Sequence, residues 1–184
     1  MPKSNFLRLL VMLLFCMAAS ARAETGIQVK SAELDMVEEV YQLKADFELN
    51  FSQAVEDALN KGVPLNFVIE FELNRPRWYW LDENISSVQR QLRISYHALT
   101  KQYRLQQQEQ QKSFASLAEL KGELGHIQEW RVVERPQLRK RYSYEARLRM
   151  KLDTSQLPKP IQVNALASKD WSLDSEWFQW ALTP

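Results

Sequence analysis

The stretch Tyr142-Ser-Tyr-Glu-Ala-Arg-Leu-Arg-Met-Lys-Leu152 alternates apolar and polar side chains along its whole length. Successive side chains of a β-strand point to opposite faces of a sheet, so Tyr144 and Leu148 share one face while Arg147 and Arg149 share the other. The pattern predicts a strand with one face on a core and one face in water. Such half-buried strands are typical of antiparallel sheets.

The same alternation recurs elsewhere in the chain. Clear examples lie at residues 41–50, 65–73 and 92–98, and weaker ones at 27–34, 78–81, 103–107, 127–133 and 161–166. Two segments instead have helical spacing, with Ser52 expected to cap a helix that ends near residue 61, and Ser113 one that ends near residue 124. The sequence therefore predicts an α+β fold, with an antiparallel sheet of about eight strands and two short helices on one face. The alternative is a two-sheet β-sandwich with peripheral helices.

The N-terminus has the features of a secretory signal peptide. Lys3 and Arg8 precede 11 apolar residues at positions 9–19, and small residues precede Glu24 at positions 21 and 23. The apolar run is shorter than the roughly 20 residues of a membrane-spanning helix. We therefore expect residues 1–23 to be a signal peptide cleaved after Ala23, which would send the protein to the periplasm.

Residues 24–184 are expected to form a single strand-rich domain. Loss of Lys3, Arg8 and Arg22 leaves 21 basic and 23 acidic residues, a net charge of −2 where the precursor has +1. Neither value favours nucleic acid as a partner. The only cysteine, Cys16, lies in the signal peptide, so a disulfide cannot stabilise this part of the chain.

Charged residues of opposite sign are segregated between strands. Acidic side chains lie on the expected outward faces of two strands and basic ones on those of two others: Asp46, Glu48, Glu70 and Glu72 against Arg90, Arg93, Arg141, Arg147, Arg149 and Lys151. These stripes can pair with one another on a solvated face. Alternatively, Arg147 and Arg149 form a basic strip that binds an anionic component of the envelope. A second basic run at residues 135–141 has the same two interpretations.

Two aromatic clusters are candidates for binding. Trp78 and Trp80 would share one face of a strand, and Trp177 and Trp180 lie close to the C-terminus. Exposed tryptophans can stack on sugars or anchor a partner, whereas buried ones dominate the energetics of a core. The core interpretation is favoured for Trp78 and Trp80, and the two are balanced for Trp177 and Trp180.

Few residues suit catalysis or metal binding. His97 and His126 have no ligand spacing around them, and no serine has the glycine-flanked setting of a nucleophile. The one carboxylate pair worth naming, Asp82-Glu83, would suit an enzyme that acts on glycans. We therefore predict no catalytic residue, no metal site and no cofactor.

Four longer segments resemble a known family. They are Asn74-Arg-Pro-Arg-Trp-Tyr-Trp80, Leu92-Arg-Ile-Ser-Tyr-His-Ala-Leu-Thr-Lys-Gln-Tyr-Arg104, Leu152-Asp-Thr-Ser-Gln-Leu-Pro-Lys-Pro160 and Asp170-Trp-Ser-Leu-Asp-Ser-Glu-Trp177. Together they resemble an exported Gram-negative bacterial family catalogued as domain of unknown function 4390. The resemblance implies no activity, ligand or catalytic residue. Genes of its members are often described near a two-component sensor kinase, which implies an accessory role in envelope sensing.

The sequence as a whole favours a non-enzymatic periplasmic binding or interaction module. Its expected partner is an envelope protein, a glycan or a lipid, and the binding candidates are Trp78, Trp80, Trp177, Trp180, Arg147 and Arg149. Two alternatives stand beside it: a carrier that holds an apolar or lipid ligand between sheet and helices, and a glycan-acting envelope enzyme.

Overall fold

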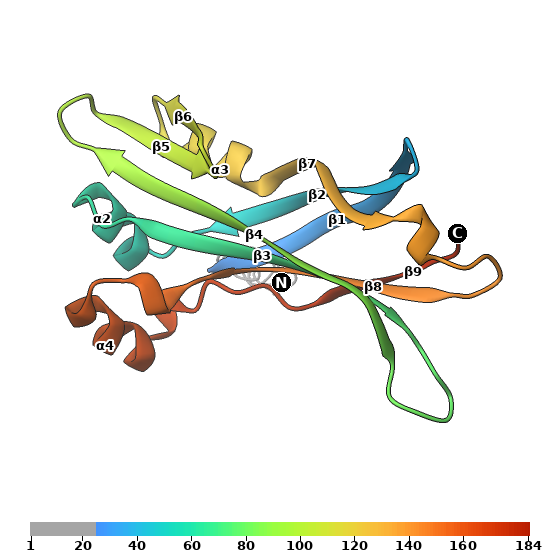
Figure 1. Cartoon of the computed structure of the whole chain (residues 1–184). Helices are drawn as coiled ribbons and strands as arrows, with labels where there is room; N and C mark the ends of the chain where they lie inside the picture. Colours follow the sequence, from blue (N-terminus) through green and yellow to red (C-terminus); the bar gives the residue numbers. More distant parts are fainter. Residues whose placement is uncertain (1–24) are drawn as a thin grey trace, which may run out of the picture.

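A computed structural model describes residues 25–184 of the chain (Figure 1). The expected signal peptide and its cleavage position at Ala23 lie outside the described residues. The strands are β1 (Gly26–Val37), β2 (Val40–Asn50), β3 (Leu65–Arg75), β4 (Glu83–His97), β5 (Gln102–Gln107), β6 (Gln110–Phe114), β7 (His126–Glu134), β8 (Tyr144–Leu152) and β9 (Phe178–Leu182). The α-helices are α2 (Gln53–Asn60), α3 (Leu117–Gly125) and α4 (Lys159–Ala167). Among residues 25–184, no helix is both long and apolar enough to cross a membrane.

The strands form two antiparallel sheets rather than the single sheet we expected. One has the order β1-β2-β7 and the other the order β6-β5-β4-β3-β8-β9. Helix α2 separates β2 from β3, so the chain leaves the first sheet before the second one begins. The β-rich, antiparallel character is confirmed, and the arrangement is closer to the two-sheet alternative.

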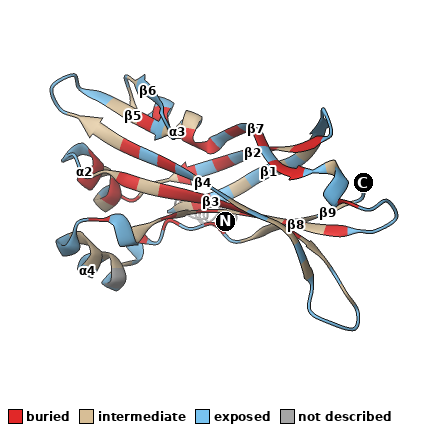
Figure 2. Cartoon of the chain, in the orientation of Figure 1, coloured by how far each residue is buried: buried red, intermediate tan, exposed pale blue. Residues whose placement is uncertain are grey.

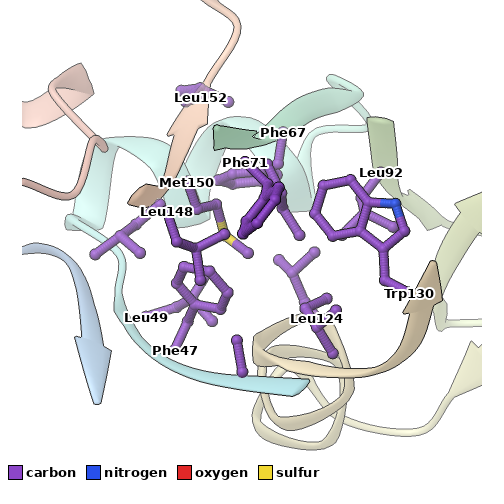
Figure 3. Packing of buried hydrophobic residues seen from close by; sticks show 14 of the residues in the cluster. Phe47, Leu49, Phe67, Phe71, Leu92, Leu124, Trp130, Leu148, Met150 and Leu152 are labelled. Atoms are coloured by element: carbon purple, nitrogen blue, oxygen red, sulfur yellow. The ribbon is translucent and has the colours of Figure 1, made fainter. Parts of the chain in front are cut away.

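The hydrophobic core lies between the two sheets. Side chains from β2, β3, β8 and α3 converge there (Figure 3), among them Phe47, Phe71, Leu124 and Leu148. Leu43, Phe67, Phe71 and Leu148 have essentially no exposed surface. The alternation along β8 sets this packing, because its even-numbered residues are buried and its odd-numbered ones are half-buried.

Helix α2 begins where the sequence predicted. The hydroxyl of Ser52 accepts a hydrogen bond from the Val55 amide at 3.2 Å and donates one to the Asp170 carbonyl at 2.8 Å. Helix α3 is capped by Ser116, not by Ser113. Ser113 is unavailable because it belongs to β6, a strand that was not among those predicted from the sequence.

Two of the weaker strand predictions are wrong. Residues 161–166 lie within helix α4, which begins immediately after Pro158 and carries Pro160 in its first turn. Proline is tolerated there because the first amides of a helix have no intrahelical acceptor. Residues 78–81 lie in the loop between β3 and β4, because Pro76 ends the ladder by removing an amide donor.

Candidate binding surfaces

The β3–β4 hairpin ends in an aromatic loop that projects away from the body of the protein (Figure 1). We call residues 76–82 the tip loop. Trp78 and Trp80 are 95% and 72% exposed. Tyr79 and Leu81 are also exposed, and Figure 2 shows that most of the loop is exposed. The Trp78 and Tyr79 rings meet edge to face, with centroids 5.3 Å apart. The preferred core interpretation of Trp78 and Trp80 is therefore wrong.

Polar contacts hold the tip loop closed. The Glu83 carboxylate pairs with Arg75 and, at 2.5 Å, with Arg77, and the Asp82 carboxylate accepts a hydrogen bond from the Arg77 amide at 3.3 Å. The hydrogen bond from Arg77 lowers the pKa of Glu83, and the charges of Arg75 and Arg139 add to this effect. A general acid of a glycosidase needs a raised pKa instead. Through these contacts, Asp82 and Glu83 stabilise the conformation of the tip loop.

A basic segment lies near the base of the hairpin. Arg139, Lys140 and Arg141 are exposed, and we call these three residues the basic loop. The Arg75 guanidinium sits 4.9 Å from the centre of the Tyr142 ring, so the residue that follows the basic loop touches the end of β3. The basic loop therefore lies beside the base of the hairpin that carries the tip loop.

The basic strip on β8 is largely neutralised by its neighbours. Glu70 pairs with Arg149 and, at 2.9 Å, with Lys151, and Arg147 lies 3.7 Å from Glu72 on the adjacent strand. Burial would raise the pKa of Glu70, but hydrogen bonds from Lys151 and Arg149 outweigh it and lower that pKa. The prediction that charged stripes pair across the ladder is confirmed here.

The two C-terminal tryptophans lie in different environments. Trp177 stacks on the charged face of β8, with the Arg147 and Arg149 guanidinium carbons 4.6 and 4.3 Å from its ring centre. Trp180 is opposite Ala146 on β8 and packs against the core, 6.3 Å from the Phe71 ring. The four candidate tryptophans therefore do not form one site: two are at the tip loop, one is on the ion-paired face and one borders the core.

The histidines make ordinary polar contacts. His126 lies 2.7 Å from the Asp46 carboxylate and His97 lies 3.0 Å from the Thr100 hydroxyl. Within residues 25–184, no three or more His, Cys, Asp or Glu side chains are grouped in a way that could hold a metal ion.

Sequence reasoning missed two members of the tip loop. Tyr79 and Leu81 were not among the binding candidates, because residues 78–81 were expected to form a strand, but both lie in the same exposed loop as Trp78 and Trp80. The available signal was Pro76, which follows Arg75 and is typical of a turn.

The sequence profile of one family, described as a domain of unknown function (DUF4390), matches residues 24–181. The chain belongs to this family. The match spans both sheets, the tip loop and the ion-paired face of β8. Comparison with characterised proteins and with solved structures finds no match.

Proposed function

We propose that this member of the family is a non-enzymatic binding module, exported to the periplasm, which docks on a phospholipid membrane through its tip loop. The observation that carries the proposal is the exposure of Trp78 and Trp80 at the end of a projecting hairpin. Two of the largest apolar side chains left in water contribute little to the stability of the fold. Exposed apolar patches of this kind are typical of interaction sites.

Tryptophan and tyrosine suit the membrane surface because each joins a large apolar ring to a polar group. They are enriched where hydrocarbon meets headgroups. Burying one large apolar side chain contributes about 1.5–3 kcal/mol. Trp78, Trp80 and Leu81 together could therefore contribute roughly 5–9 kcal/mol before the costs of association.

The basic loop makes anionic lipid the preferred surface. A lysine or arginine close to such a surface contributes about 1 kcal/mol, so Arg139, Lys140 and Arg141 together contribute about 3 kcal/mol. The apolar contribution is larger. We therefore expect salt to weaken membrane binding without abolishing it.

The alternatives have less support. An enzyme that uses Asp82 and Glu83 would need to free both carboxylates from contacts with Arg77, and Glu83 from Arg75 as well. A carrier needs an internal apolar cavity, whereas buried side chains such as Phe71 and Leu148 occupy the middle of the space between the sheets (Figure 3).

The test is co-sedimentation of residues 24–184 with vesicles of phosphatidylcholine alone or mixed with phosphatidylglycerol. The wild-type protein should sediment with both, and more strongly with the mixed vesicles. The double variant Trp78→Ser, Trp80→Ser should bind at least a hundredfold more weakly, because two rings no longer enter the interface. The matched control is Leu99→Ser, which changes another exposed apolar residue (92% exposed) in the turn just beyond the far end of β4.

Three results would contradict the proposal. They are absence of vesicle binding by the wild-type protein, equal binding by the tryptophan double variant, and an equal loss in the Leu99→Ser control. Retention of a protein partner without vesicle binding would assign the tip loop to protein recognition instead.

A further inference from the structure

A polar cleft runs between the two sheets, on the side where β4 faces β7. Its volume is about 650 Å³. Strand β4 pairs with β5 only from Arg93 to His97, and among the described residues β7 pairs only with β2. The unpaired edges of β4 and β7 therefore lie beside each other. The Ser86 hydroxyl donates a hydrogen bond to the Val132 carbonyl at 2.7 Å and links them.

The cleft is lined mostly by amides and guanidinium groups. Its walls come from β3, β4, the end of β5, β7 and the loop before α4: Asn66, Gln89, Arg90, Gln91, Leu92, Arg93, Gln106, Gln108, Glu129, Trp130, Arg131 and Gln156. An amide side chain both donates and accepts hydrogen bonds, as a sugar hydroxyl does. Glu129 is the single carboxylate in this lining, against three arginines.

These arginines differ from those on β8. None of the ion pairs among residues 25–184 includes Arg90, Arg93 or Arg131, whereas Arg147 and Arg149 both have a glutamate partner. From the alternation alone, Arg90 was expected on an outward face, as Arg147 and Arg149 were. Instead it lies on the same side of β4 as the buried Leu92 and contacts Trp130 across the cleft.

Arg90 is held in position by an aromatic ring. Its guanidinium carbon lies 4.7 Å from the centre of the Trp130 ring, and burial lowers its pKa. A guanidinium remains charged at neutral pH, and stacking occupies its face while leaving its N–H groups at the edge for a ligand. A cation fixed in this way is already ordered before an anion arrives, which lowers the entropic cost of binding.

A β-bulge shapes the opposite wall. Trp130 is paired with Leu43 and Ile127 with Ala45, so Gln128 and Glu129 together face one residue of β2. Glu129 has a φ of 51°, in the left-handed region that non-glycine residues rarely occupy. Bulges of this kind redirect side chains, and strained backbone is concentrated at functional sites.

A second hollow, of about 520 Å³, continues from the first. Arg90, Leu92 and Glu129 line both, and the second one extends to Lys112 and His126. Together the two hollows have more volume than a single sugar or phosphate ion occupies.

We propose that this cleft binds an oligosaccharide carrying carboxylate or phosphate groups, with Arg90 contacting the anions from the inner side of β4, the exposed Arg93 and Arg131 contacting them from the rim, and the surrounding amides contacting the hydroxyls. An extended peptide could also reach the free edges of β4 and β7, but it would need apolar pockets for alternate side chains. The lining offers amides and charges instead. The proposal does not depend on membrane docking by the tip loop.

The test is an NMR titration of residues 24–184 with an oligogalacturonate and, as the uncharged counterpart, its methyl ester. Binding of the acid form at millimolar concentrations or below should shift the amide signals of β4 and β7. Arg90→Gln and Arg131→Gln should each weaken binding about tenfold, because each removes a charge-assisted contact. The control is Arg139→Gln, which changes the net charge equally but lies in the basic loop, and it should leave affinity within twofold of the wild type.

Each of four outcomes would overturn the proposal. They are no shift with the acid form, equal affinity for the ester, equal loss in Arg139→Gln, and tighter binding of a hexaglutamate peptide than of the oligogalacturonate. The last result would assign the cleft to acidic protein segments.

Discussion

Trp78 and Trp180 are both tryptophans, yet the structure predicts opposite consequences when each is removed. Trp78 is 95% exposed, so folding buries only about a twentieth of its roughly 250 Å² of surface. At about 25 cal/mol per Å² this burial contributes roughly 0.3 kcal/mol. Trp78→Ser should therefore change the free energy of unfolding by less than about 0.5 kcal/mol.

Trp180 packs against Phe71 and Phe178, with ring centroids 6.3 and 5.7 Å away. Removing a buried aromatic side chain costs about 3–5 kcal/mol, and Trp180 is only partly buried. We therefore expect Trp180→Ala to lower the free energy of unfolding by about 2–3 kcal/mol.

Urea denaturation followed by far-UV circular dichroism measures both values on the same scale. The urea midpoint of Trp78→Ser should coincide with that of the wild type, and that of Trp180→Ala should fall clearly. A loss above 1 kcal/mol for Trp78→Ser would mean that the tip loop is packed against the domain. An unchanged free energy of unfolding in Trp180→Ala would mean that the Trp180 ring does not belong to the core. Either result would refute the conclusion that Trp78 is exposed while Trp180 packs against the core.

Three further predictions concern the fold and its pH dependence. Gly125→Ala should destabilise the protein by about 1–3 kcal/mol, because the new Cβ would overlap the Phe47 carbonyl. Gly122→Ala has open space around it and should stabilise helix α3 by about 0.5–1 kcal/mol. Thermal unfolding of the two variants measures both effects. Ser52→Ala should cost about 1–2 kcal/mol in the same assay, since it removes the cap of α2. Glu70 has a lowered pKa in the folded state, so its stabilising effect is complete above its unfolded pKa of about 4.3 and is lost as pH falls through the folded value. Urea midpoints from pH 7 to 3 should therefore decline less steeply below pH 4.5 in Glu70→Gln, and an unchanged slope would contradict this.

Alternation predicted the principal strands well. Residues 65–73 and 142–152 lie in or beside β3 and β8, and they are adjacent in the larger sheet. A period of two is a local property, so it can be recognised in a single segment. The cap at Ser52 was predictable for the same reason, because the signal lies within a few residues.

Features that depend on distant contacts were not predictable. The division into two sheets depends on which strands pair, and alternation does not specify partners. The inward position of Arg90 depends on Trp130 in another sheet, 40 positions later in the chain. The exposure of Trp78 and Trp80 follows from the absence of a neighbouring element over the tip loop among residues 25–184, and the residues of the loop do not encode that.

The most direct test of membrane docking uses a single environment-sensitive fluorophore in the tip loop. Residues 24–184 contain no cysteine, so Leu81→Cys can be labelled uniquely. Leu99→Cys provides a control that is also exposed and lies just beyond the other end of β4. We predict that adding phosphatidylglycerol-containing vesicles shifts the emission of the label at position 81 to shorter wavelength and leaves that at position 99 unchanged. An unchanged emission at position 81, or equal shifts at both positions, would contradict docking through the tip loop.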